Sequence, residues 1–194
     1  MHKSVRVSAL FFINLKACMY NVCMLNRKDE LISERLTLKS IKEDSKKEFL
    51  EIVKDPLVKK SYMLPDFSNE KEEENFFQKL RNFTLDKSKF VYGIYSMNKI
   101  IGFINQVCLE NDVIELGYFI ASKEWNKGYA TEALKTAINE LFRMGIKTVQ
   151  AGHFENNPAS GRVMQKAGMH KIKKTEVIVY RNEEHKCVFY EISR

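Results

Sequence analysis

The sequence contains little glycine and proline and no long hydrophobic run. Only 8 Gly and 3 Pro occur among its 194 residues, which excludes collagen-like and low-complexity structure. No stretch approaches the ~20 uninterrupted apolar residues of a membrane-spanning helix, so we expect no membrane partner. The remaining balance of 44% hydrophobic and 29% charged residues is that of a globular chain with a sizeable core.

Cysteine is scarce and scattered, at positions Cys18, Cys23, Cys108 and Cys187. The first two are followed by no Cys/His pair at zinc-binding spacing, so no metal site is predicted. All four are interpreted as free thiols of a reducing compartment, which predicts a cytoplasmic location. Cys108 and Cys187 lie in apolar segments and are expected in the core, where cysteine acts as a small hydrophobe.

The net charge of +7 is modest and unevenly distributed. Residues 1–30 hold five basic and two acidic residues, which leaves four of the seven net charges to the rest of the chain. Nucleic-acid binding needs basic residues gathered on one face rather than a thin excess. We therefore expect no nucleic-acid partner, whereas anionic small molecules fit the charge.

Residues 1–24 combine a short apolar stretch with basic residues on both sides, as a signal peptide does. Asn14 and Lys16 interrupt the apolar stretch, however, and no small-residue cleavage motif follows. We predict an N-terminal extension over residues 1–30 and one domain over residues 31–194. Whether residues 1–24 belong to the working protein stays open, because a later methionine is an alternative start.

The hydrophobic patterns predict more strands than helices. The expected strands cover residues 32–39, 90–96, 100–109, 113–121, 147–154, 172–180 and 186–192. The expected helices run from Asp44 to just before Pro56, over residues 69–82, from Gly128 to Gly145, and over residues 158–167. Turn residues at Asn98 and at 111–112 indicate an antiparallel meander. Only residues 113–154 show the strand, helix, strand order of a parallel crossover.

The most informative segment runs from Glu115 to Ala133. In it, a strand leads into a short loop that delivers Gly128 at the mouth of a helix. Unpaired backbone N–H groups and the helix dipole make such a helix start an anion site, and a diphosphate fits it. The segment lacks the three glycines of a Rossmann fingerprint and the G-x-x-x-x-G-K-[ST] of a P-loop. The structural alternative is that Gly128 only permits a tight turn.

A second segment, residues 156–169, follows one strand later, where a parallel crossover places it beside the first. With both segments in this order, the chain resembles the GNAT family of N-acetyltransferases over residues 32–192. The family's acyl-CoA loop, Q/R-x-x-G-x-G/A, has its counterparts in Trp125, Gly128 and Ala130. Its helix signature, N-x-x-S followed by K-x-G-F, has its counterparts in Asn157, Ser160, Lys166, Gly168 and Met169. Residues 34–36 resemble the first strand of the branch that acetylates ribosomal-protein N-termini (RimJ/RimL type).

This resemblance implies an α+β fold with a six- to seven-stranded, mostly antiparallel sheet and helices on both faces. The fourth and fifth strands, residues 113–121 and 147–154, would run parallel and splay apart, with acetyl-CoA as co-substrate in the splay. The implied cofactor-binding residues are Phe119, Ile120, Ala121, Asn126, Lys127, Gly128, Tyr129, Ala130, Asn157 and Ser160. Backbone groups of the first three would pair with the pantothenyl arm, and the amides of residues 126–130 would hold the diphosphate. Trp125 replaces the family's Gln/Arg, so a side-chain phosphate contact is lost there.

Amine acetylation requires a base for the ammonium proton and an acid for the leaving thiolate. Glu115 is the candidate base, because its strand face is otherwise apolar and raises a carboxylate pKa unless a partner is present, and because the family places an acid here. A salt-bridged structural glutamate is the alternative. Ser160, or water, is the candidate acid, since Met164 stands where many family members have a tyrosine. Asn157 before Pro158 also suits a helix N-cap.

The acceptor is expected to contact residues 59–67, between the first two helices, and the last hairpin. Residues 59–67 are aromatic and mildly basic, which suits a peptide N-terminus better than a polycation. His153 and Glu155 are further candidates to face the acceptor. The favoured function is acetylation of a protein N-terminal α-amine by direct attack in a ternary complex, by a monomer or homodimer. A small-molecule amine or antibiotic acetyltransferase and a non-catalytic acyl-CoA sensor stay open as alternatives.

Overall fold

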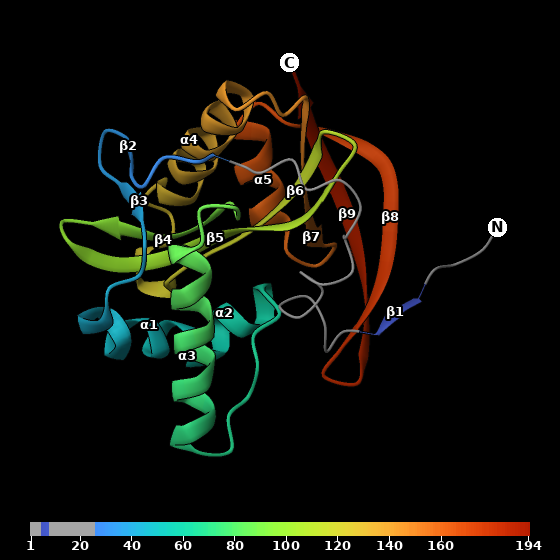
Figure 1. Cartoon of the computed structure of the whole chain (residues 1–194). Helices are drawn as coiled ribbons and strands as arrows, with labels where there is room; N and C mark the ends of the chain where they lie inside the picture. The colour runs from blue at the N-terminus through green and yellow to red at the C-terminus, as the bar shows by residue number, and fades with distance from the viewer. Residues whose placement is uncertain (1–4, 8–25) are drawn as a thin grey trace.

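The computed structural model describes residues 5–7 and 26–194, which build one nine-stranded sheet (Figure 1). The strands are β1 (Val5–Val7), β2 (Leu31–Ile32), β3 (Thr37–Lys39), β4 (Val91–Ser96), β5 (Lys99–Glu110), β6 (Val113–Ile120), β7 (Thr148–Phe154), β8 (His170–Tyr180) and β9 (Glu183–Ser193). Their order across the sheet is β1-β8-β9-β7-β6-β5-β4-β3-β2. Neighbours pair antiparallel except β6 with β7 and β1 with β8. The predicted mixed, mostly antiparallel sheet is confirmed.

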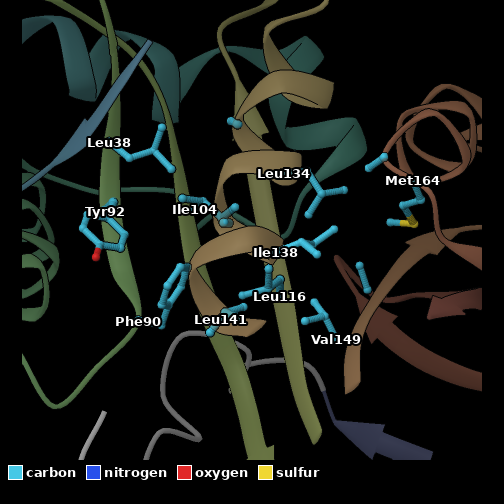
Figure 2. Close-up of a cluster of buried hydrophobic side chains, with 14 of the residues drawn as sticks. Leu38, Phe90, Tyr92, Ile104, Leu116, Leu134, Ile138, Leu141, Val149 and Met164 are labelled. Atoms are coloured by element: carbon cyan, nitrogen blue, oxygen red, sulfur yellow. The ribbon is translucent and has the colours of Figure 1, made fainter. Parts of the chain in front are cut away.

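Helices cover both faces of the sheet, as predicted (Figure 1). The α-helices are α1 (Lys46–Lys54), α2 (Pro56–Ser61), α3 (Glu70–Leu85), α4 (Tyr129–Arg143) and α5 (Pro158–Lys166), with short 3-10 helices η2 (Glu43–Ser45) and η3 (Ser122–Glu124). On one face, α4 and α5 bury Leu134, Ile138 and Met164 against Leu116 and Val149 of the sheet (Figure 2). On the other face, α1, α2 and α3 enclose a second core. The two faces of β6 are therefore packed against different helices.

Three details of the expected fold are wrong. Residues 5–7 and 26–194 contribute nine strands to the sheet rather than six or seven, because β1 and β2 extend its two edges. Residues 32–39 do not form one strand, since a turn closed by the Ser33 N–H and the Leu36 carbonyl at 2.9 Å separates β2 from β3. The region expected to connect the first two helices begins with a helix of its own, α2, which Asp55 caps and Pro56 opens.

The parallel strands β6 and β7 splay apart, which confirms the central feature of the predicted fold. Residues 113–116 pair with residues 148–151, and the pairing then stops. Beyond that point β6 stays paired with β5 and β7 stays paired with β9. A gap therefore opens between residues 117–120 of β6 and residues 152–154 of β7.

The described part of the N-terminal region packs onto the sheet and its helices. Arg27 is buried, donates hydrogen bonds to the carbonyls of Thr84 and Lys89, and lies 4.3 Å over the ring of Tyr92. β1 adds a parallel edge strand to β8. The apolar stretch of the signal-like segment, Cys18 and Cys23 lie outside the described residues, and the domain boundary at residue 30 stays a prediction. In the part of the chain that the structure describes, no helix is both long and apolar enough to span a membrane.

Candidate functional site

The loop between β6 and α4 exposes backbone amides at a helix N-terminus. Asn126 and Gly128 have left-handed φ angles of 62° and 83°, so the chain turns sharply and Gly128 becomes the N-cap of α4. Among the described residues, a Cβ at Gly128 would meet only Nη2 of Arg35, at 3.3 Å. The amides of the first turn have no intrahelical partner and carry the positive end of the helix dipole. The anion site predicted from the sequence therefore has an open approach.

Arg35 and Glu132 fix this loop from outside. The Arg35 guanidinium donates to the Lys127 carbonyl at 2.9 Å and to the Glu132 carboxylate at 2.7 Å, and it lies 4.8 Å over the Tyr129 ring. Glu132 also accepts from the Arg35 backbone N–H and the Ser33 hydroxyl, each at 2.8 Å. Burial acts to raise the pKa of Glu132, but these hydrogen bonds and the Arg35 charge leave the pKa below its usual value. Sequence reasoning missed this role, because the two partners lie far apart in the chain.

A cavity of about 520 Å³ lies beside this loop, between the starts of α4 and α5 and along β6. All predicted cofactor-binding residues line it except Ala121: Phe119, Ile120, Asn126, Lys127, Gly128, Tyr129, Ala130, Asn157 and Ser160. The exposed cations Arg162 and Lys166 also line it, whereas Lys127 is paired with Glu124 at 2.8 Å. The cavity thus combines a polyphosphate-binding helix start, positive charge and an open strand edge, which are the features that an acyl-CoA needs.

Both backbone groups of Ala121, a predicted contact of the pantothenyl arm, are engaged within the chain. Its N–H donates to the Ile101 carbonyl at 2.8 Å and its carbonyl accepts from the Glu124 N–H at 2.9 Å. Backbone groups alternate in direction along a strand. The backbone N–H and carbonyl of Phe119 are therefore directed to β5, on the same side as the N–H of Ala121. Those of Ile120 are directed to the gap.

Trp125 replaces the polar residue of the family loop and has a contact of its own. Its indole Nε1–H donates to the Ile120 carbonyl at 2.8 Å, and its ring lines the cavity. The carbonyl of Ile120 is therefore already engaged on its open side. The N–H of a pantothenyl arm has less backbone to pair with than the family resemblance implied.

Two hydroxyl groups lie at the start of α5. Asn157 caps the helix as predicted, with its Oδ1 accepting from the Ser160 N–H at 3.4 Å and its Nδ2 donating to Ser160 Oγ at 3.1 Å. The Tyr118 hydroxyl donates to the Ser160 carbonyl at 3.4 Å, and burial raises the pKa of Tyr118. Met164 is 1% exposed and belongs to the core. Tyr118 was missed, although strand alternation from Leu116 places it on the face that α5 covers.

Glu115 lies on the opposite face of β6, where it lines a second pocket of about 50 Å³. The side chain is buried, and its Oε2 lies 3.5 Å from Nζ of Lys174. Tyr62 lines the same pocket and donates its hydroxyl to Asn105 Oδ1 at 2.9 Å. Burial, and then the Glu115 charge, raise the pKa of Tyr62. This second pocket meets the larger cavity at Ser61, which lines both.

The other predicted residues have mixed positions. His153 lines the second pocket; its Nδ1 donates to the Phe154 carbonyl at 2.7 Å, its Nε2 is buried with no hydrogen-bond partner among the described residues, and burial lowers its pKa. Glu155 lines neither pocket and is paired with Lys186 at 2.6 Å. Cys187 lines the second pocket as a buried thiol whose pKa burial raises to about 12. Cys108 is half-buried rather than in the core.

The expected acceptor segment meets the last hairpin, but it is less basic than its sequence indicates. Asp66 accepts from Lys59 and from Arg181, each at 2.6 Å, and Tyr180 donates its hydroxyl to the Leu64 carbonyl at 2.9 Å. The positive charge of Lys59 is therefore compensated. In the described residues, no group of three His, Cys, Asp or Glu side chains is arranged to hold a metal ion.

Comparison with known proteins gives one consistent family. Residues 35–170 match the family model for an acetyltransferase (GNAT) domain. The "Uncharacterized N-acetyltransferase p20" of Bacillus licheniformis is 23% identical over 148 residues, covering 74% of this chain and 83% of the relative. A GNAT-family acetyltransferase from Bacillus anthracis has a TM-score of 0.72 and 24% identity, over 84% of this chain and 98% of that one. RimL, a ribosomal-protein alpha-N-acetyltransferase solved with coenzyme A, has a TM-score of 0.70 and 17% identity, over 84% and 97%.

Proposed function

Because the chain belongs to the GNAT family of acetyltransferases, we propose that it moves the acetyl group of acetyl-CoA onto the α-amine of a protein or peptide N-terminus. The observation that carries this proposal is the meeting of two pockets at the splay of β6 and β7. One is wide and bordered by cations, and the other is small and holds the buried Glu115. A donor on one side of the sheet and an amine on the other can thus be held together.

The residues around the larger cavity fit acetyl-CoA. Bound there, acetyl-CoA supplies the thioester acyl group. The amides of residues 126–130 hold its diphosphate at the start of α4, and Arg162 and Lys166 lie where further phosphate charge can be neutralised. The backbone N–H of Ile120 is directed to the gap and orients the pantothenyl arm.

Proton transfer is assigned to side chains on the two faces of β6. Glu115 accepts the proton of the incoming ammonium at its carboxylate. Ser160 Oγ or the Tyr118 hydroxyl holds a proton near the leaving sulfur. Direct attack of the amine is favoured over an enzyme thioester, because the raised pKa of Cys187 keeps its thiol protonated and non-nucleophilic.

A peptide N-terminus suits the second pocket better than a polycation. The pocket is small and lined mainly by apolar side chains such as Met63, Ile178 and Phe189, with one buried carboxylate. A single ammonium with a small side chain fits this lining, whereas a polyamine needs several acidic groups. RimL, whose named acceptor is a ribosomal protein's α-amine, shares the fold.

Thiol release from acetyl-CoA over an amine panel tests this function. The panel contains four amines. The first is a peptide with a free Ala N-terminus, and the second is an N-formylated peptide whose only amine is an internal Lys. The others are spermidine and an aminoglycoside. We expect turnover with the free N-terminus only. Faster turnover of the lysine side chain or of a polycation would replace the acceptor assignment.

A non-catalytic acyl-CoA sensor is the second candidate, favoured by the buried Met164 at the family's tyrosine position. Acetyl-CoA would then raise Tm without turnover of any amine in the panel. Against this candidate stands Tyr118, which lines the same cavity and offers a phenol hydroxyl in place of the missing tyrosine.

Residues 31–194 are proposed to form the catalytic domain, and the reducing cytoplasm is the proposed location. Cys187 is a free, buried thiol, which supports that location.

A further inference from the structure

Lys174 extends from β8 across the sheet to β6. A register shift between Lys171 and Thr175 interrupts the pairing of β8 with β9 at this residue. The Lys174 ammonium lies 3.5 Å from Glu115 Oε2, on a strand that is three positions away in the sheet. A long side chain thus leaves its own strand to reach the candidate base.

The surroundings of this ammonium form a cation site. Nζ of Lys174 lies 3.4 Å from Gln150 Oε1, 3.6 Å from Glu176 Oε1 and 4.1 Å from the centroid of the Phe189 ring. The Glu115 and Glu176 side chains are only 10% and 18% exposed, so water screens their charges weakly. Two oxygen acceptors at hydrogen-bond distance, a second carboxylate beside them and a ring face suit the charge and the donors of a primary ammonium.

This cation site borders the second pocket. Glu115 and Phe189 belong to both, and the second pocket meets the acyl-CoA cavity at Ser61. Any amine that reaches the thioester through the second pocket must bring its ammonium group past the same carboxylate and the same ring. Lys174 therefore stands where an acceptor's ammonium is needed.

We propose that Glu115, Gln150, Glu176 and the Phe189 ring form the subsite for the acceptor's ammonium group, and that Lys174 occupies it until an acceptor displaces it. The ligand class is a monocationic primary amine with a small apolar body. Lys174 can leave because its side chain is unbranched and 35% exposed. The inference rests on the proposed function. It adds that Lys174 competes with the acceptor for this subsite and so sets the affinity for the acceptor.

The test compares Lys174→Met, the double variant Lys174→Met with Glu176→Gln, and a matched control, Lys173→Met. Lys173 is the exposed neighbour on the same strand. The probes are the peptide with a free Ala N-terminus and butylamine. Two measurements are made on the full chain: KM and kcat from thiol release, and amine binding by calorimetry to the protein loaded with coenzyme A.

Removing the competitor is expected to strengthen amine binding. Lys174→Met should lower the acceptor KM and the calorimetric Kd about three- to tenfold, without lowering kcat or acetyl-CoA affinity. Adding Glu176→Gln to the Lys174→Met protein should raise the acceptor KM by a similar factor, because a carboxylate partner of the acceptor is lost and no competitor remains. Lys173→Met should change neither, since its ammonium lies outside the subsite.

Several results would overturn the subsite. One is an unchanged or higher KM in a folded Lys174→Met protein, which would make Lys174 neutral or helpful to acceptor binding. Another is no binding of either amine to wild type and variant while both bind acetyl-CoA. Lys174→Gln, which keeps a polar side chain, repeats the test if Lys174→Met does not fold. If the wild-type protein does not bind acetyl-CoA, the proposed function itself is refuted, so the two failures are distinguishable.

Discussion

Placing a carboxylate at Gly128 tests whether the start of α4 holds the cofactor. Gly128 has φ 83°, so a side chain there costs about 1–2 kcal/mol of backbone strain. Gly145, just beyond α4, has φ 91°, and a Cβ added there would have no described atom within 4 Å, which makes Gly145→Glu the matched control. Both substitutions add the same strain and the same charge at opposite ends of one helix.

Both variants should lose about 2–8 °C of Tm, since each kcal/mol is worth about 2–4 °C in a chain of this size. The control loses slightly more, because a carboxylate at a helix C-terminus costs about 0.3–1 kcal/mol. At a concentration 100-fold over Kd, acetyl-CoA stabilises a binding-competent protein by about 2.7 kcal/mol. A charge about 4 Å from a phosphate opposes binding by about 4 kcal/mol near a protein surface, which removes almost all of that stabilisation.

The assay is thermal unfolding of wild type, Gly128→Glu and Gly145→Glu, with and without acetyl-CoA. We expect an acetyl-CoA-induced Tm rise in wild type and in Gly145→Glu, and none in Gly128→Glu. Equal rises in the two variants would refute the assignment of the loop, because strain and charge would then act on stability alone. A wild-type Tm that NAD raises and acetyl-CoA does not would refute the cofactor itself.

Three further predictions concern individual side chains. Glu115→Gln should lower kcat by about 10²–10⁴ while acetyl-CoA affinity stays unchanged, and the loss should shrink at high pH as the amine deprotonates unaided; an unaltered kcat at neutral pH would remove Glu115 from the mechanism. Tyr118→Phe and Ser160→Ala should identify the general acid. The variant that lacks the acid should have a lower kcat in steady-state assays, whereas the other variant should change only Tm. A wild-type kcat in both variants would leave proton donation to water. Arg35→Gln should weaken acetyl-CoA binding by about tenfold in calorimetry, since the Lys127 carbonyl loses its anchor, and wild-type affinity would show that the loop holds its shape unaided.

Short-range features of the fold were readable from the sequence. Asn157 caps α5 as predicted, and α3 begins next to its cap Asn69, at the start of the helix expected over residues 69–82. The left-handed turn at Asn111 and Asp112 lies between the expected strands. Each of these depends on a few neighbouring residues, because caps and tight turns satisfy nearby backbone groups. Residues 181–182 form a turn with the same left-handed φ angles, and this turn connects the paired strands β8 and β9.

The residues that line the larger cavity were also largely predictable, for a related reason. A strand, a glycine and a helix start within one stretch fix where backbone amides point, and Gly128 and Asn157 lie on the expected cavity. Contacts from residues outside this stretch were missed. Ala121 is unavailable because β5 continues alongside β6, and Arg35 reaches Glu132 from 97 residues away.

The acceptor side was decided by the tertiary structure. Glu115 could be picked out as an acid on an apolar strand face, but its cation partner Lys174 lies 59 residues further along the chain, on a strand three positions away in the sheet. Asp66 likewise pairs with Arg181, which lies 115 residues further along the chain. Local sequence rules act through backbone geometry over a few residues, whereas the charge and shape of a pocket depend on which side chains the sheet order brings together.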